Sequence, residues 1–160
     1  DRAATTQQAV DLLLSYDMFA TSGRDYHFYI TDAQGDGRVV EFDCDSPERL
    51  PVVTPTRQVT NFFVMHEDKV APVQKIGASG RGRVRYDASS AVLDGAPSGQ
   101  DAQVTAWKAL RTASQEPNPE DVTSNTQWSI VFDNANLTAD VALRRRWADV
   151  HHADIHGNMV

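Results

Sequence analysis

Two short apolar segments, YHFYI at residues 26–30 and RVVEF at residues 38–42, determine the expected fold. Both are rich in aromatic or β-branched residues, which favour β-strands. The segment between them, DAQGDG at residues 32–37, is polar and contains two glycines. The three segments together predict an antiparallel hairpin with a longer loop. A second strand pair is predicted further along the chain, at residues 127–132 and 137–143 around a DNAN turn.

Helices are predicted where capping residues precede apolar residues at helical spacing. Thr5 is a suitable N-cap for a helix over residues 5–14, and Gln8 completes a capping box. Asp101 similarly predicts a helix that continues to about Ser114. A shorter helix is expected at residues 87–93.

Less regular segments complete the expected layout. The region after residue 51 is rich in Val and Thr and predicts two short extended pieces, divided by Pro55, with the second at residues 58–64. The tail from Ala148 shows no clear pattern. Strand pairs alternating with helices favour an α+β class, or a layered α/β class, with antiparallel sheets. The 160 residues suffice for the single domain, 1–160, that we expect.

The charge balance excludes some classes of partner. The chain has 15 Lys and Arg against 22 Asp and Glu, a net charge of −7, which argues against nucleic-acid binding. The basic clusters RGRVR at 81–85 and RRR at 144–146 are interpreted as strand or surface stretches. No apolar run is long enough for a transmembrane helix, and the opening residues DRAA do not resemble a signal peptide. We therefore expect no nucleic-acid or membrane partner, and the compartment stays open.

Several possible sites receive a simpler interpretation. Asp32, Gln34 and Asp36 occupy calcium-loop spacing, but their flanks are predicted strands, which favours a plain hairpin turn. The single cysteine, Cys44, lies between acids that raise a thiol pKa, which predicts an unreactive thiol.

The histidine-rich tail and a serine segment give weak signals. HHADIH at residues 151–156 has metal-ligand spacing, although a solvated tail is the preferred interpretation. GASG at residues 77–80 lacks the second glycine of a nucleophile elbow, and no phosphate-binding or dinucleotide-binding motif occurs.

Five segments, in order along the chain, resemble the choloylglycine hydrolase family, which includes bile-salt hydrolases and penicillin V acylases. The segments are AVDLLLSYDM at 9–18, HFYITD at 27–32 with VVEF at 39–42, VTNF at 59–62, RYD at 85–87, and TQWSIVFD at 126–133. The resemblance implies the C-terminal portion of an N-terminal-nucleophile fold, in which two antiparallel sheets stack between helical layers (αββα). It implies part of a linear amide C–N hydrolase whose first-residue Cys attacks the amide carbonyl. A related acyltransferase and a non-catalytic binding or structural domain of the same fold are the alternatives.

Two residues match positions with roles in that family. Asn61 matches an Asn whose side-chain amide helps to form the oxyanion hole, and the alternative is that it simply ends a strand. Arg85 matches an Arg beside the nucleophile, whereas a solvated or ion-paired arginine is the alternative. Arg83, which has the same parity on a strand, is the other candidate for that role.

The sequence departs from the family at the nucleophile. Asp1 stands at the start of the chain and Cys44 is internal, so residues 1–160 alone are expected to have no hydrolase activity. No cofactor or metal is implied. The expected partners are a small-molecule amide substrate, the missing N-terminal portion of the same protein, and further copies in a homo-oligomer.

Overall fold

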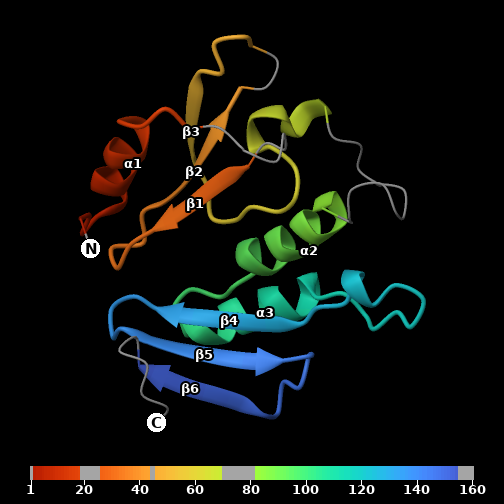
Figure 1. Ribbon diagram of the computed structural model, residues 1–160. Helices are drawn as coiled ribbons and strands as arrows, with labels where there is room; N and C mark the ends of the chain where they lie inside the picture. The colour runs from red at the N-terminus through yellow and green to blue at the C-terminus, as the bar shows by residue number, and fades with distance from the viewer. Residues whose placement is uncertain (1, 19–25, 44–45, 70–81, 155–160) are drawn as a thin grey trace. The chain divides into compact units, whose positions relative to one another are not determined.

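The chain forms two compact units, Asp1–Ala71 and Pro72–Val160, which are described separately (Figure 1). The computed structural model describes residues 2–18, 26–43, 46–69 and 82–154. The first unit contains α1 (Thr6–Leu14), β1 (His27–Thr31), β2 (Gly37–Phe42), β3 (Pro51–Pro55) and the 3-10 helix η1 (Val64–Lys69). The second contains α2 (Gly82–Asp94), α3 (Ala102–Ala113), the 3-10 helix η2 (Val122–Ser124), β4 (Trp128–Asp133), β5 (Thr138–Leu143) and β6 (Val150–Asp154).

Each unit combines helices with one three-stranded antiparallel sheet, which confirms the predicted α+β class. The sheet orders are β1-β2-β3 and β4-β5-β6. Both predicted strand pairs are present, with His27 opposite Glu41 in the first and Trp128 opposite Leu143 in the second. That all 160 residues form a single domain stays a prediction.

The core of the first unit lies between α1 and one face of its sheet. Val10 of α1 is buried against Val40 and Phe42 of β2. Partly buried apolar side chains surround these three, namely Leu13, Met18, Phe28, Ile30 and Val53. Alternation along the strands places the neighbouring residues, including Glu41, on the opposite face.

The start of α1 is fixed by its own cap and by the β1–β2 loop. The Thr5 hydroxyl oxygen accepts a hydrogen bond from the Gln8 N–H at 3.2 Å, as the capping box predicts. The Asp32 carboxylate accepts one from the Thr6 N–H at 2.8 Å, and the Thr6 hydroxyl donates to the Asp36 carbonyl at 2.7 Å. The Thr6 N–H, despite an opposing effect of desolvation, holds the pKa of Asp32 below its ordinary value. The loop therefore joins the hairpin to the helix.

In the second unit, α2 packs against α3, and α3 packs against β4. Asp101 caps α3 as predicted, accepting hydrogen bonds from the Gln103 and Val104 N–H groups. Gln103 also donates to the Asp140 carboxylate, so α3 covers the sheet face that carries Asp140. On this same face Ser129, Val131 and Ala142 are buried.

The other face of the β4–β5–β6 sheet is apolar and largely exposed. Trp128 is 63% exposed and Phe132 is 61% exposed. Strand alternation and register show which other residues lie on this face. They are Ile130 of β4, Ala139, Val141 and Leu143 of β5, and His151 and Ala153 of β6. No acidic or basic side chain other than His151 belongs to this set of described residues.

Several local predictions were wrong. The described part of RGRVR, residues 82–85, opens α2 and forms no strand. The helix predicted at 87–93 is present within α2, which begins earlier, at Gly82. Residues 58–64 form no second strand, and the tail contributes β6. Within the described residues, no helix is both long and apolar enough to cross a membrane.

Candidate functional site

Asn61 lies at the tip of a tight turn that leads into η1. The Phe62 N–H donates to the Thr60 carbonyl at 2.9 Å, so the chain reverses across a single residue. The Asn61 side chain is exposed, while Phe62 is buried and anchors the turn. The turn and the burial of Phe62 hold the backbone at Asn61 in place.

Glu41 holds the segment that follows this turn. Its side chain is completely buried, and its two carboxylate oxygens accept hydrogen bonds from the Val64 and Met65 N–H groups, each at 2.8 Å. These N–H groups belong to the first turn of η1, which has no intrahelical acceptor for them. In place of the strand predicted for residues 58–64, the chain turns at Asn61, and this carboxylate fixes the start of η1 at Val64.

His27 completes the site from the neighbouring strand. Its Nδ1 lies 3.1 Å from Oε1 of Glu41, directly across the β1–β2 register. Its ring also packs against Phe63, with centroids 5.8 Å apart, and Phe63 packs against His66 at 6.5 Å. The imidazole therefore contacts both the buried carboxylate and the segment beside Asn61.

The charge on Glu41 is stabilised despite its burial. Desolvation alone would raise the pKa of this carboxyl group. Hydrogen bonds from His27 and from the Met65 and Val64 N–H groups outweigh the desolvation, so the pKa lies below its ordinary value. Glu41 is therefore an ionised group that organises the backbone, and its two oxygens are already occupied.

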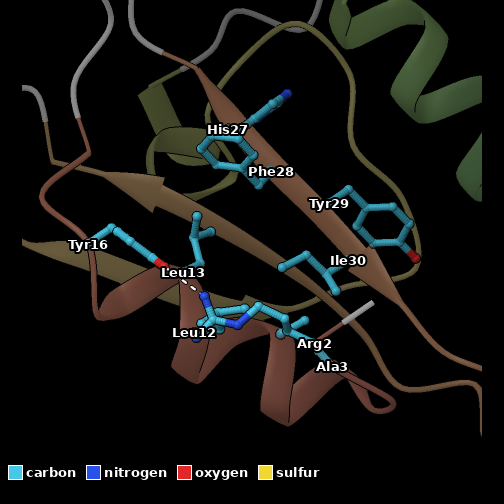
Figure 2. A pocket seen from close by; sticks show the side chains of 10 residues that line it. Arg2, Ala3, Leu12, Leu13, Tyr16, His27, Phe28, Tyr29 and Ile30 are labelled. Atoms are coloured by element: carbon cyan, nitrogen blue, oxygen red, sulfur yellow. Dashed lines mark hydrogen bonds between the residues drawn. The ribbon is translucent and has the colours of Figure 1, made fainter.

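A groove of about 640 Å³ lies between α1 and β1, on the other side of the strand (Figure 2). Its apolar lining comes from Leu12 and Leu13 of α1 and from Phe28 and Ile30 of β1. His27 also lines the groove, and Figure 2 shows its side chain pointing away from Leu13 and Ile30. The groove offers space for an apolar group.

One rim of the groove is polar. Arg2 Nη1 donates to the Tyr16 hydroxyl at 3.1 Å, and both residues line the groove. A guanidinium paired with a phenol at the rim can orient a polar end of a bound molecule, but it supplies no general base at neutral pH.

Arg85 lies in the other unit, on α2. Its side chain is half-buried, and burial lowers the pKa of its guanidinium. Arg83 pairs with Asp87 at 2.8 Å along the helix. Residues two apart on a helix point in different directions, so the predicted equivalence of Arg83 and Arg85 on a strand is wrong.

The remaining candidates do not form sites within the described residues. The Asp32 carboxylate is engaged by backbone N–H groups in a hairpin turn, the interpretation preferred over a calcium loop. His151 and His152 point to opposite faces of β6, and no group of three or more potential metal ligands occurs in the described part of the chain. Cys44, Ser79 and His156 lie outside the described residues.

Glu41 is the functional residue whose role the sequence analysis missed. An acid inside the apolar run RVVEF, opposite a histidine in the paired strand, is a signal for a buried charge with a partner. No family model, curated protein or solved structure matches the chain. The resemblance to choloylglycine hydrolases therefore stays a prediction based on the five sequence segments.

Proposed function

We propose that this chain is part of a linear amide C–N hydrolase of the choloylglycine hydrolase type, with Asn61 as an oxyanion-hole donor. The observation that carries the proposal is the exposed Asn61 amide on a turn whose continuation is anchored by the buried Glu41. A donor stabilises a developing oxyanion best when it is fixed before the reaction starts. Glu41 and His27 are positioning residues for that donor.

The proposed reaction begins with an N-terminal Cys that lies outside residues 1–160. The α-amino group takes the thiol proton, and the sulfur attacks the amide carbonyl carbon. The resulting oxyanion accepts a hydrogen bond from the Asn61 amide. The C–N bond then breaks, the amine leaves with the proton, and water hydrolyses the thioester to release the acid and restore the thiol. A role for Arg85 near the nucleophile, where a guanidinium favours the thiolate, stays a prediction from the resemblance alone.

The β4–β5–β6 sheet supports the layered αββα arrangement that belongs to this proposal. Helix α3 covers one face, and the other face is apolar, with Trp128 and Phe132 on its edge strand β4. Such a face is suited to packing against a second antiparallel sheet, at a separation of about 10 Å. We assign it to the interior of the complete enzyme.

The test is an assay of the full-length gene product with penicillin V, conjugated bile salts and acyl-homoserine lactones. Asn61→Asp keeps the shape of the side chain and removes its N–H donor. It is expected to lower kcat by about a hundredfold or more, with little change in KM, because the lost interaction forms only in the transition state. Gln100→Glu makes a matched amide-to-acid change in the loop before α3 and is expected to leave kcat unchanged.

The same assay separates the alternatives. An effect of Asn61→Asp below threefold removes Asn61 from the site. Turnover that survives replacement of the first-residue Cys rejects the mechanism. Transfer of the acyl group to an added amine in preference to water identifies an acyltransferase. The absence of turnover on every amide, with folding retained, favours the non-catalytic domain.

A further inference from the structure

The turn after β5 has an unusual composition for its backbone conformation. The Arg146 N–H donates to the Leu143 carbonyl at 2.9 Å, and the two central residues, Arg144 and Arg145, have φ of 47° and 60°. Tight turns with positive φ at both central positions strongly favour Asn and Gly, because a Cβ atom strains this region. Two consecutive arginines are therefore unexpected at these positions, and interactions of their side chains could compensate for the backbone strain.

The side chain of Arg145 has a structural role. Its guanidinium makes a two-point ion pair with the carboxylate of Glu116, and its Nε donates to the Ser114 hydroxyl at 3.1 Å. These contacts fasten the turn to the segment that follows α3. They also neutralise the charge of Arg145, which leaves it as an anchor for the turn.

The side chain of Arg144 has no comparable structural contact among the described residues. Within the described residues, its guanidinium makes no hydrogen bond or ion pair, although its backbone N–H donates to the Gln127 carbonyl at 2.8 Å. Arg144 lines a cleft of about 540 Å³ between the turn and residues 115–127. The volume lies within the range of small-molecule sites, about 300–1,000 Å³.

The lining of the cleft defines the kind of molecule that fits. No carboxylate is among the lining residues, and of the two arginines that line the cleft Arg145 is already paired with Glu116, so Arg144 is the group that can attract an anion. Thr126 accepts a hydrogen bond from the Gln115 N–H at 2.8 Å and keeps its hydroxyl proton for a ligand. Pro117 and Val122 contribute an apolar surface to the lining of the cleft. The site thus pairs one uncompensated guanidinium with an apolar surface.

We propose that this cleft binds a small organic carboxylate, with Arg144 as the group that recognises the carboxylate. A guanidinium offers two parallel N–H donors that match the two carboxylate oxygens. The apolar body of the ligand packs against Pro117 and Val122. This inference goes beyond the proposed hydrolase function and does not depend on it, because every residue of the cleft lies in the second unit.

The experiment is a titration of the protein with sodium benzoate at fixed ionic strength. Binding is monitored by calorimetry and by the NMR chemical shifts of the backbone amides. Benzamide serves as the neutral ligand of the same shape, and inorganic phosphate as the anion without an apolar body. Benzoate is expected to bind at least tenfold more tightly than either and to shift the amides of Thr126 and Gln127. Equal binding of benzamide or phosphate, or no binding of benzoate, overturns the proposal.

The variants isolate the guanidinium. Arg144→Asn removes it and places at this position a residue that tolerates positive φ, so folding is retained. Benzoate affinity is expected to fall at least tenfold. Arg146→Asn removes an equal charge two residues away, outside the residues that line the cleft, and is expected to change affinity by less than threefold. Equal losses in the two variants would mean that only the general charge of the turn attracts the ligand, which rejects the assignment.

Discussion

His27 and Glu41 face each other across β1 and β2, with Nδ1 of the imidazole 3.1 Å from Oε1 of the carboxylate. The same carboxylate accepts hydrogen bonds from the Val64 and Met65 N–H groups, more than twenty residues further along the chain. One buried side chain thus connects the first hairpin to the segment that contains Asn61. The stability of the first unit and the geometry of the proposed donor both depend on it.

Replacing Glu41 by Gln should destabilise the first unit substantially. An amide of the same shape places an NH₂ group against one backbone N–H, which leaves a buried donor unsatisfied at a cost of about 1–3 kcal/mol. Loss of the interaction with His27 adds to this cost. Urea unfolding is the measurement. The matched control is Glu48→Gln, an exposed carboxylate that accepts from Ser46 and should change stability by no more than about 0.5 kcal/mol. Similar effects of the two substitutions would contradict the structural role of Glu41.

The lowered pKa of Glu41 also predicts how stability depends on pH. A carboxyl group whose pKa is lower in the folded state stabilises the protein above its ordinary value, 4.5, and this contribution is lost as pH falls through the folded pKa. The unfolding free energy should therefore decrease below about pH 4.5 more steeply in the native protein than in Glu41→Gln. The lowered pKa of Asp32 also makes stability fall at low pH, equally in the native protein and in Glu41→Gln. The difference between the two stability curves therefore reports the contribution of Glu41. Parallel stability curves would show that Glu41 has no shifted pKa.

The elements that the sequence predicted are those set by local chemistry. The capping box of Thr5 and Gln8, the Asp101 cap and the polar loops between paired strands all involve residues close in sequence. η1 could not be predicted in this way, because its start is fixed by a carboxylate on β2. β6 was missed because its sequence, VHHAD, lacks the apolar alternation of a strand and forms by pairing with β5.

The candidate site was predicted only in part. The sequence placed Asn61 in an extended piece at residues 58–64, whereas the structure places it in a turn, where it is exposed. Its role, like that of Arg85, came from a resemblance and stays a prediction. The cleft beside Arg144 brings residues 115–127 together with a turn about twenty residues later, so a linear pattern of three arginines could not reveal it.

Substitution of Gly37 by Ala should destabilise the β1–β2 hairpin. A Cβ atom at this position would lie 2.6 Å from the Tyr29 hydroxyl and 2.8 Å from the Thr56 carbonyl oxygen. The tyrosine could move, but the carbonyl belongs to the backbone that pairs with Gly37, since the Thr56 N–H donates to the Gly37 carbonyl at 2.9 Å. We expect a loss of about 1–3 kcal/mol in urea unfolding, as for other overpacked positions.

Gly35 provides the comparison for this experiment. It has φ of 82° and open space around its Cβ position. Gly35→Asn should therefore cost less than Gly37→Ala, because Asn tolerates positive φ. The reverse order would show that the hairpin is limited by conformational strain at the loop and not by the contact at Gly37.

Arg144 offers a test of strain at the proposed carboxylate site. Arg144→Gly removes a Cβ atom from a residue at φ of 47° and should relieve up to about 1–2 kcal/mol of strain, offset by the greater entropy of an unfolded glycine. We expect a thermal midpoint equal to or higher than that of the native protein, together with loss of benzoate binding. A clear loss of stability would mean that the arginine supports the fold, and its unusual conformation would then need no ligand.

The apolar face of the second sheet gives the sharpest test of the layered architecture. If Trp128 and Phe132 pack against another sheet in the complete protein, Phe132→Asp buries an uncompensated charge and should cost more than about 3 kcal/mol. Leu137→Asp makes the same kind of change in the β4–β5 turn, outside the strands, at a residue that is 51% exposed, and should cost no more than about 0.5 kcal/mol. Tryptophan fluorescence of a full-length variant that keeps Trp128 as its single tryptophan provides a second measurement, because a buried Trp128 emits at shorter wavelength and resists quenching by iodide. If the two substitutions have equally small effects and Trp128 is quenched freely, the face is in contact with water, and the stacked arrangement is wrong for this protein.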